Sequence, residues 1–124
     1  MTDIYIDGGC SGNPGPMRIA MFIPDYNIRR ILELLVHGTN NIAEYMALVM
    51  TLKFLIRNTI PHVELFVIKS DSKLVVEQMN GTWKVNDEIL LSLHNQAIGL
   101  LKLLPKVTLQ WIPRDQNLAG KLLE

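Results

Sequence analysis

The order of its apolar segments limits what this chain can fold into. Three short runs with strand character occupy residues 4–7, 19–23 and 30–36, and a stretch with helical spacing follows from 42 to 58. A dense apolar run at 63–68, helical segments, a fifth run at 107–112 and a short C-terminal helix complete the order. We therefore expect an α/β fold: a five-stranded mixed sheet, three antiparallel then two parallel strands, flanked by helices.

Local signals set the expected boundaries of these elements. Pro24 to Asn27 favour a tight hairpin connection, and Thr39 to Asn41 supply capping side chains for the long helix. Residues 70–72 end the fourth strand and cap a short helix that runs to Met79, and a further helix spans 87–104. In such sheets a ligand crevice lies beyond the carboxyl ends of the parallel strands, where Asp71 is expected.

Composition bounds the class of protein. At 124 residues, with 48% apolar and 19% charged residues, the chain has the size and composition of one folded domain, residues 1–124. Cys10 is the one cysteine, which excludes an internal disulfide and Cys/His zinc clusters. No segment has the length and apolar character of a membrane span or the pattern of a signal peptide, so a cytoplasmic location is expected. The formal net charge of zero means that any phosphate recognition is local.

Three acids stand at the ends of predicted elements. Asp7 ends the first strand, Glu44 lies in the first turn of the long helix, and Asp71 ends the fourth strand. Each has an ordinary alternative: a turn residue, a favourable charge at a helix N-terminus and a helix cap, respectively. Acids at element ends can also converge, and carboxylates that crowd together repel one another unless divalent cations neutralise them.

The contexts of these acids resemble the type 1 ribonuclease H family. Residues 7–16 resemble the family's opening signature, 39–44 its second motif and 70–72 its third, and Trp83-Lys84 after Asn80-Gly81 matches the segment that follows. The matches span nearly the whole chain in the family's order. The resemblance implies one ribonuclease H domain that hydrolyses the RNA strand of RNA/DNA hybrids.

The resemblance also implies the metal chemistry. Asp7 would bridge two divalent ions, and Glu44 and Asp71 would hold the second, with products that carry a 5′-phosphate and a 3′-hydroxyl. Mg²⁺ is the expected ion, with Mn²⁺ as a substitute, because hard oxygen ligands select hard cations. Two alternatives stay open: a hybrid-binding module that has lost turnover, and a different nuclease or resolvase on the same fold. The Gly-rich loop and the Thr39 to Asn41 segment argue against a resolvase or another nuclease, because in the family that they resemble these elements recognise the hybrid and not four-way junctions.

The fourth acid of the family is missing from the C-terminal segment. We expect Asn117 in its place, where it can offer a carbonyl oxygen to a metal ion, and Asn117→Asp is then expected to raise activity. Other alignments place Lys121 or Gly120 there, and Asp115 is near enough to supply the charge. Asn117 can also be an ordinary helix cap.

Histidine assistance is not expected at this site. Arg114 lies in the shortened segment where larger family members carry a catalytic histidine. His37, His62 and His94 fall outside the motifs and are expected to be structural.

The resemblance implies contacts to both strands of the hybrid. The expected RNA-strand contacts, made near the 2′-hydroxyls, are Gly8, Cys10, Asn13 and Asn41. The expected DNA-strand contacts are Thr39, Trp83, Lys84 and Asn86. The alternatives are that the polar residues only form turns and helix caps, that Trp83 packs in the core, and that Lys84 is a surface lysine without a role. Because the family's basic protrusion after the tryptophan is absent, we expect a modest, salt-dependent affinity for the hybrid.

No obligate protein partner is evident, and we expect a monomer.

Overall fold

The computed structural model describes residues 1–58 and 64–124, and five strands form one sheet. The strands are β1 (Thr2–Cys10), β2 (Gly15–Ile23), β3 (Ile28–Gly38), β4 (Phe66–Ser70) and β5 (Val107–Trp111), in the order β3-β2-β1-β4-β5. β2 is antiparallel to both of its neighbours, whereas β4 is parallel to β1 and β5 is parallel to β4. The predicted mixed sheet is confirmed.

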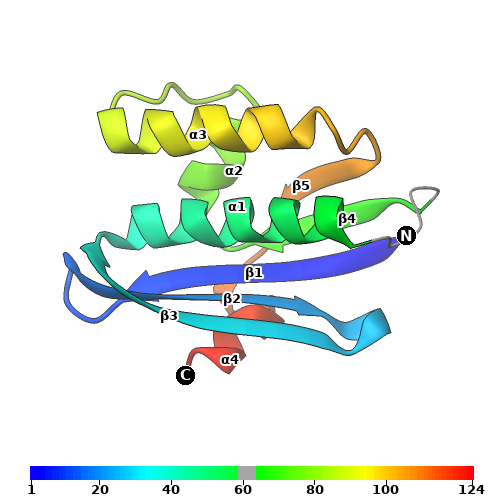
Figure 1. Cartoon of the computed structure of the whole chain (residues 1–124), viewed down its shortest axis with the longest axis horizontal. Coiled ribbons are helices and arrows are strands. Elements are labelled where there is room, and N and C mark those ends of the chain that lie inside the picture. The colour runs from blue at the N-terminus through cyan, green and yellow to red at the C-terminus, as the bar shows by residue number, and fades with distance from the viewer. Residues whose placement is uncertain (59–63) are drawn as a thin grey trace.

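The helices lie on both faces of the sheet. Figure 1 shows α1 (Asn40–Arg57), α2 (Lys73–Met79) and α3 (Glu88–Leu101) on one face and α4 (Leu118–Leu122) on the other. Two short 3₁₀ helices, η1 (Pro24–Tyr26) and η2 (Arg114–Gln116), lie in the β2–β3 hairpin and before α4. No helix among the described residues is long and apolar enough to cross a membrane.

The caps predicted from the sequence are present, and several strands are longer than predicted. Thr39 Oγ1 accepts a hydrogen bond from the Ile42 N–H, and Ser72 caps α2 in the same way. β1 continues to Cys10 because the Gly-rich end of the strand keeps pairing with β2, which itself begins at Gly15. The predicted strand at 63–68 is found from Phe66 onward, and position 63 lies outside the described residues.

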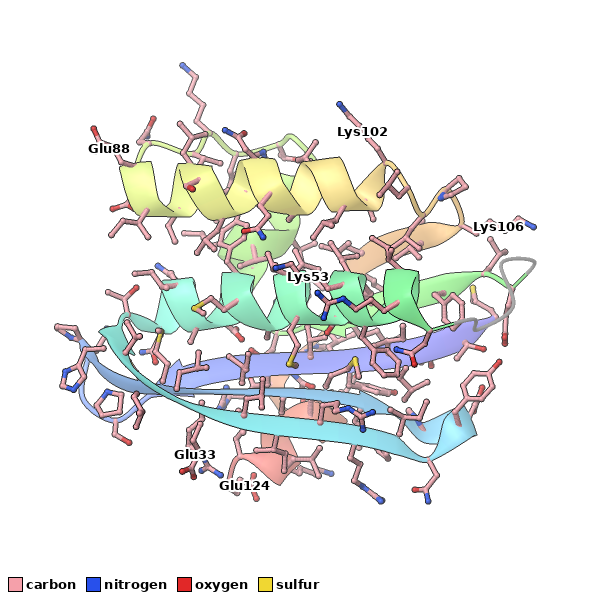
Figure 2. All side chains as sticks on the ribbon, in the orientation of Figure 1. Glu33, Lys53, Glu88, Lys102, Lys106 and Glu124 are labelled. Carbon is pink, nitrogen blue, oxygen red and sulfur yellow. The ribbon has the colours of Figure 1, made fainter. Side chains whose placement is uncertain are left out.

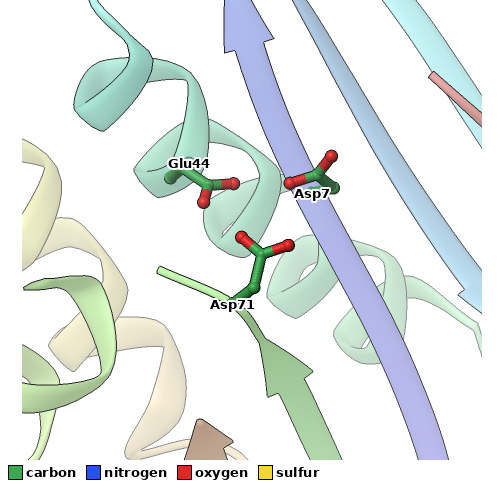
Figure 3. Close-up of side chains that lie close together, drawn as sticks. All are labelled: Asp7, Glu44 and Asp71. Carbon is green, nitrogen blue, oxygen red and sulfur yellow. The ribbon is translucent and has the colours of Figure 1, made fainter. Parts of the chain in front are cut away.

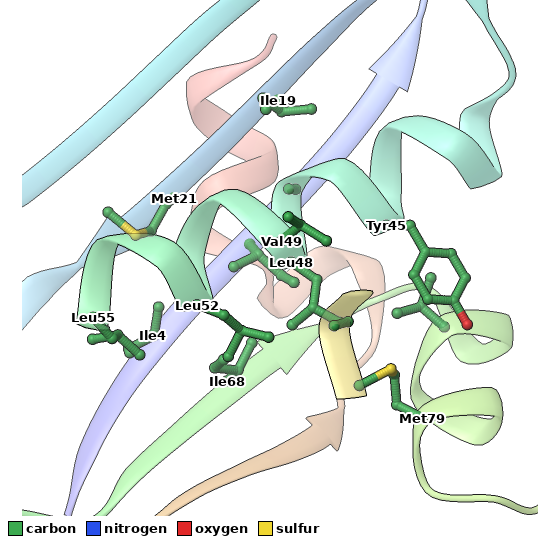
Figure 4. Packing of buried hydrophobic residues seen from close by; sticks show 14 of the residues in the cluster. Ile4, Ile19, Met21, Tyr45, Leu48, Val49, Leu52, Leu55, Ile68 and Met79 are labelled. Carbon is green, nitrogen blue, oxygen red and sulfur yellow. The ribbon is translucent and has the colours of Figure 1, made fainter. Parts of the chain in front are cut away.

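The core lies between the sheet and α1. Leu48 and Leu52 of α1 belong to one buried cluster with Ile4 of β1 and Ile68 of β4, and all four are fully buried (Figure 4). Burying an aliphatic side chain of this size contributes about 1.5–3 kcal/mol. α3 packs on the side of α1 that faces away from the sheet, so α1 is the central helix of the domain. The position of α1 therefore determines which side chains of its N-terminal turns face the sheet.

Candidate active site

Three carboxylates meet where β1, β4 and α1 come together. Asp7 lies within β1 and not at its end as predicted, because β1 keeps pairing with β2 as far as Cys10. Glu44 lies in the second turn of α1 and not in the first, because the helix begins at Asn40, and Asp71 comes directly after β4. One oxygen from each carboxylate lies within 4.8 Å of the other two, and Figure 3 shows the three side chains pointing toward one another. Since β1 and β4 are adjacent parallel strands, Asp71 follows the carboxyl end of β4 beside the middle of β1. The convergence expected from the positions of these acids is present.

Gly8 allows the close approach that brings Glu44 to Asp7. A Cβ atom on Gly8 would lie 2.3 Å from the carbonyl oxygen of Ala43, so only glycine fits between β1 and α1 at this point. The Gly8 N–H donates to Glu44 Oε1 at 2.6 Å. A backbone hydrogen bond thus holds the glutamate beside the strand that carries Asp7.

The cluster carries more negative charge than its surroundings balance. Asp7 is only 3% exposed, and its Oδ1 has no hydrogen-bond partner among the described residues. Burial, and then the charge of Asp71, raise the pKa of Asp7 to about 6. Burial, and then the charge of Asp7, raise the pKa of Glu44 well above its usual value. Crowded, buried oxygen ligands with an unpartnered oxygen fit a divalent cation.

Asn117 contacts the cluster through its amide nitrogen. Nδ2 donates to the Ile6 carbonyl at 2.9 Å and to Asp71 Oδ2 at 3.0 Å, and Oδ1 accepts from the Ala119 N–H at 3.1 Å. Only the NH₂ group can donate to two acceptors, so these partners fix the orientation of the amide. The carbonyl oxygen that we predicted as a metal ligand caps α4, and the NH₂ group faces Asp71.

The other candidates for the fourth position differ in where they lie. Gly120 is buried, and a Cβ atom there would lie 3.4 Å from Asp7 Oδ2. Lys121 and Asp115 are exposed. The position of α4 that faces Asp7 therefore carries no side chain. Within the described part of the chain, the acidic cluster consists of Asp7, Glu44 and Asp71.

Arg114 places a positive charge beside the acids. Its Nη1 lies 3.5 Å from Asp71 Oδ2, and its side chain is 77% exposed. Its charge also opposes the rise in the pKa of Asp7. Our prediction for this segment assigned Arg114 no role of its own, so this contact with the cluster is an addition from the structure.

An open cleft of about 610 Å³ leads to the acids. Gly8, Cys10 and Asn41, which were predicted to contact RNA, line it together with two basic residues that the sequence did not single out, Arg18 and Lys73. Arg18 lies in β2 and Lys73 in α2, and neither belongs to a motif of the sequence. Only the tertiary structure reveals that they border the cleft.

Asn40 is a further residue that the sequence reasoning missed. Its Oδ1 accepts from the Cys10 N–H at 3.1 Å and contacts Cys10 Sγ at 3.2 Å, and its own N–H donates to Asn13 Oδ1 at 3.1 Å. Asn40 thus ties the Gly-rich loop to the start of α1. The doublet after the cap, Asn40-Asn41, was a signal that could have indicated it.

The predicted DNA-strand contacts lie in the α2–α3 connection and at the start of α1. Trp83 is 45% exposed, which excludes the alternative of a core aromatic, and Lys84 and Asn86 are exposed as well. These three residues do not line the cleft that holds the acids. Thr39 caps α1 and is half-buried.

A buried polar chain anchors the α2–α3 connection. Gln78 Nε2 donates to the Lys84 carbonyl at 3.0 Å, and Gln78 Oε1 accepts from the Tyr45 hydroxyl at 2.7 Å. Burial raises the pKa of Tyr45 to about 12, so its hydroxyl keeps the proton that it donates. His94 lies 3.4 Å from the same hydroxyl.

Neither of the two histidines that the structure describes belongs to the acidic cluster. His94 belongs to the buried chain just described, and His37 is exposed at the end of β3. His62 lies outside the described residues.

The strand order, the helical layers and the acidic cluster together define a domain of the ribonuclease H fold. A family model described as "Reverse transcriptase-like" matches residues 6–123. The chain belongs to the type 1 ribonuclease H family.

Individual relatives agree with this assignment. A bifunctional protein of Mycobacterium tuberculosis is 36% identical over 92% of this chain, and ribonuclease HI of Halobacterium salinarum is 31% identical over 91%. The matches cover 32% and 57% of the lengths of those two proteins, so this chain corresponds to only part of each. The crystal structure of LC11-RNase H1 in complex with an RNA/DNA hybrid is 28% identical, has a TM-score of 0.85 and is matched over 100% of both chains.

Proposed function

We propose that this protein is an endoribonuclease that hydrolyses the RNA strand of RNA/DNA hybrids. The observation that carries the proposal is the buried cluster of Asp7, Glu44 and Asp71 at the head of an open cleft on a ribonuclease H fold. The likeness to LC11-RNase H1, which binds an RNA/DNA hybrid in its crystal structure, supports the choice of substrate.

Asp7, Glu44 and Asp71 would hold the metal, with Mg²⁺ as the ion, Mn²⁺ as its substitute and two ions during catalysis. Divalent cations at such a site supply a nucleophilic water and stabilise the leaving oxygen, which yields a 5′-phosphate and a 3′-hydroxyl. The unpartnered Asp7 Oδ1 and the raised pKa of Asp7 support this assignment, because both describe a carboxylate that lacks a positive partner.

Neighbouring groups of the chain would orient these ligands. The Gly8 N–H holds Glu44, while the Asn117 amide and the Arg114 guanidinium hold Oδ2 of Asp71. We therefore assign Asn117 to the site as the hydrogen-bond donor that orients Asp71, in place of the ligand role that the sequence indicated. The exposed Arg114 would also meet the phosphate of a substrate.

The substrate contacts remain those implied by the family resemblance. Gly8, Cys10 and Asn41, which line the cleft, would meet the RNA strand together with Asn13, which accepts a hydrogen bond from the Asn40 N–H. Thr39, Trp83, Lys84 and Asn86 would meet the DNA strand, and their exposure in the α2–α3 connection supports this for the last three. Without a basic protrusion, the affinity should be modest and should fall steeply with salt. A cytoplasmic location stays a prediction.

A specific observation also supports the alternative of a hybrid-binding module with impaired catalysis. Gly120 faces Asp7 where an acid would complete the ligand set, and the Asn117 amide turns a donor toward Asp71. A site with one carboxylate fewer binds divalent cations more weakly.

A cleavage assay separates the two functions. An end-labelled RNA strand annealed to DNA is incubated with Mg²⁺ and then with Mn²⁺, beside duplex DNA and duplex RNA. We expect cleavage of the hybrid's RNA strand alone, and loss of cleavage with retained binding in Asp71→Asn. Binding without products under both ions would establish the module, and neither binding nor products would overturn both functions.

A further inference from the structure

β3 forms one edge of the sheet and presents apolar side chains there. It is 11 residues long, and no strand in the described part of the chain pairs with its outer edge. Leu35 is 97% and Val36 68% exposed, and Ile31 and Leu32 are close to half exposed. A long edge strand with exposed apolar residues is a template for pairing with another strand.

The charges on β3 have a self-complementary order. Arg29, Ile31 and Glu33 pair in register with Phe22, Ala20 and Arg18 of β2, and their side chains lie on the sheet face opposite α1. Figure 2 shows Glu33 on the same side of the sheet as Glu124 at the C-terminus, away from Lys53 of α1. The three residues therefore read positive, apolar and negative along one face.

We propose that a second copy of this chain docks on β3, antiparallel, with Ile31 opposite Ile31 of the second copy. Directly opposite residues of antiparallel strands share a face, so this register sets Arg29 against Glu33 of the second copy, twice by symmetry. If the two-fold axis of the dimer passed through Arg30 or Leu32 and not through Ile31, Arg29 would no longer lie opposite Glu33 and both ion pairs would be lost. The charge pattern thus selects one register of self-pairing.

The other side chains of β3 agree with this register. On the α1 face, Ile28 falls opposite Leu34 and Arg30 opposite Leu32 of the second copy, which covers two partly exposed leucines. Arg30 already stacks on the Phe54 ring of α1 at 5.2 Å, so its charge is held back from the centre of the interface. Leu35 and Val36 lie at the irregular end of the β2–β3 pairing and extend the apolar surface toward the hairpin of the second copy.

The dimer joins two sheets edge to edge. The acidic cluster lies between β1 and β4, with β2 between β1 and the dimer edge, so both clefts stay open. The interface replaces our expectation of a monomer. It does not rest on the proposed function, because no residue of β3 belongs to the acidic cluster.

Charge reversal tests the interface by sedimentation velocity over a range of protein concentrations. Glu33→Arg and Arg29→Glu each convert two attractive pairs into repulsive ones and should weaken dimerisation by about tenfold or more. The double variant Arg29→Glu/Glu33→Arg restores opposite charges and should restore the dimer. Lys102→Glu, a reversal of the same size on the exposed end of α3, should leave it unchanged.

The outcomes divide clearly. A monomeric wild type at about 100 µM overturns the proposal, since a dimer with a Kd near or below that concentration would be populated there. A dimer that ignores both single reversals lies on another surface and also overturns it. If a single variant unfolds, as circular dichroism would reveal, the double variant decides: a restored dimer supports the register and a folded monomer refutes it.

Discussion

Replacing Asp7 by asparagine should stabilise the metal-free protein, although Asp7 is central to the site. In the folded protein the pKa of this carboxyl is raised from 3.8 to about 6, first by burial and then by Asp71. The folded state therefore binds the proton more tightly than the unfolded state does. Stability from this group is fully present below pH 3.8 and is lost as the pH rises to about 6.

The size of the effect follows from the shift. A rise of roughly two pKa units corresponds to about 3 kcal/mol of unfavourable free energy at pH 7, an upper value for what Asp7→Asn recovers. At about 4 °C per kcal/mol for a domain of this size, the melting temperature should rise by up to about 12 °C.

Thermal melts in EDTA measure this directly. We expect Asp7→Asn to melt above the wild type at pH 7 and close to it at about pH 3, where Asp7 is largely protonated in both the folded and the unfolded state. Mg²⁺ should raise the melting temperature of the wild type and have little effect on the variant. Asp115→Asn, which changes an exposed acid outside the cluster, should melt as the wild type does. An asparagine variant no more stable than the wild type at pH 7 would refute the claim that the metal-free cluster is strained by its own charge.

Three further substitutions test other parts of the structure. Gly8→Ala puts a Cβ atom 2.3 Å from the Ala43 carbonyl oxygen, so urea denaturation should reveal a loss of about 3 kcal/mol, and unchanged stability would contradict the packing of α1 on β1. Asn117→Asp should lower the free energy of unfolding of the metal-free protein by about 1–3 kcal/mol, measured by melts in EDTA. The reason is that a carboxylate would replace the amide NH₂ group that donates to the Ile6 carbonyl and to Asp71. A more stable variant would contradict the assigned orientation of the amide. Gln78→Met removes the hydrogen bond that Gln78 donates to the Lys84 carbonyl. The KM for hybrid cleavage should then rise severalfold, with kcat nearly unchanged. An unchanged KM would show that the α2–α3 connection takes no part in substrate binding.

Much of the fold follows from local chemistry that the sequence displays. Thr39, Ser72 and Asp87 cap the three longer helices through their own side chains, and such contacts span only three residues. The spacing of apolar residues between 42 and 56 predicts the buried side of α1 for the same reason. The ends of the strands were less predictable, because β1 and β2 extend through their pairing with each other and not through local preference.

The site was predictable in its acids and less so in its surroundings. Asp71 follows β4 and Glu44 lies near the start of α1, and the strand order places both beside Asp7 of β1, so their meeting follows from topology. The orientation of the Asn117 amide depends on the Ile6 carbonyl, 111 residues away in the sequence. The positions of Arg18 and Asn40 depend likewise on how β2 and α1 approach the Gly-rich loop, which only the tertiary structure provides.

The central claim is that Asp7, Glu44 and Asp71 jointly hold divalent cations. Anomalous scattering from crystals soaked in Mn²⁺ tests it most directly, because the peak locates the metal among its ligands. We predict a peak in contact with oxygens of all three carboxylates and its loss in Asp71→Asn. A soaked crystal with no peak between these side chains, or with manganese bound only elsewhere, would contradict the account.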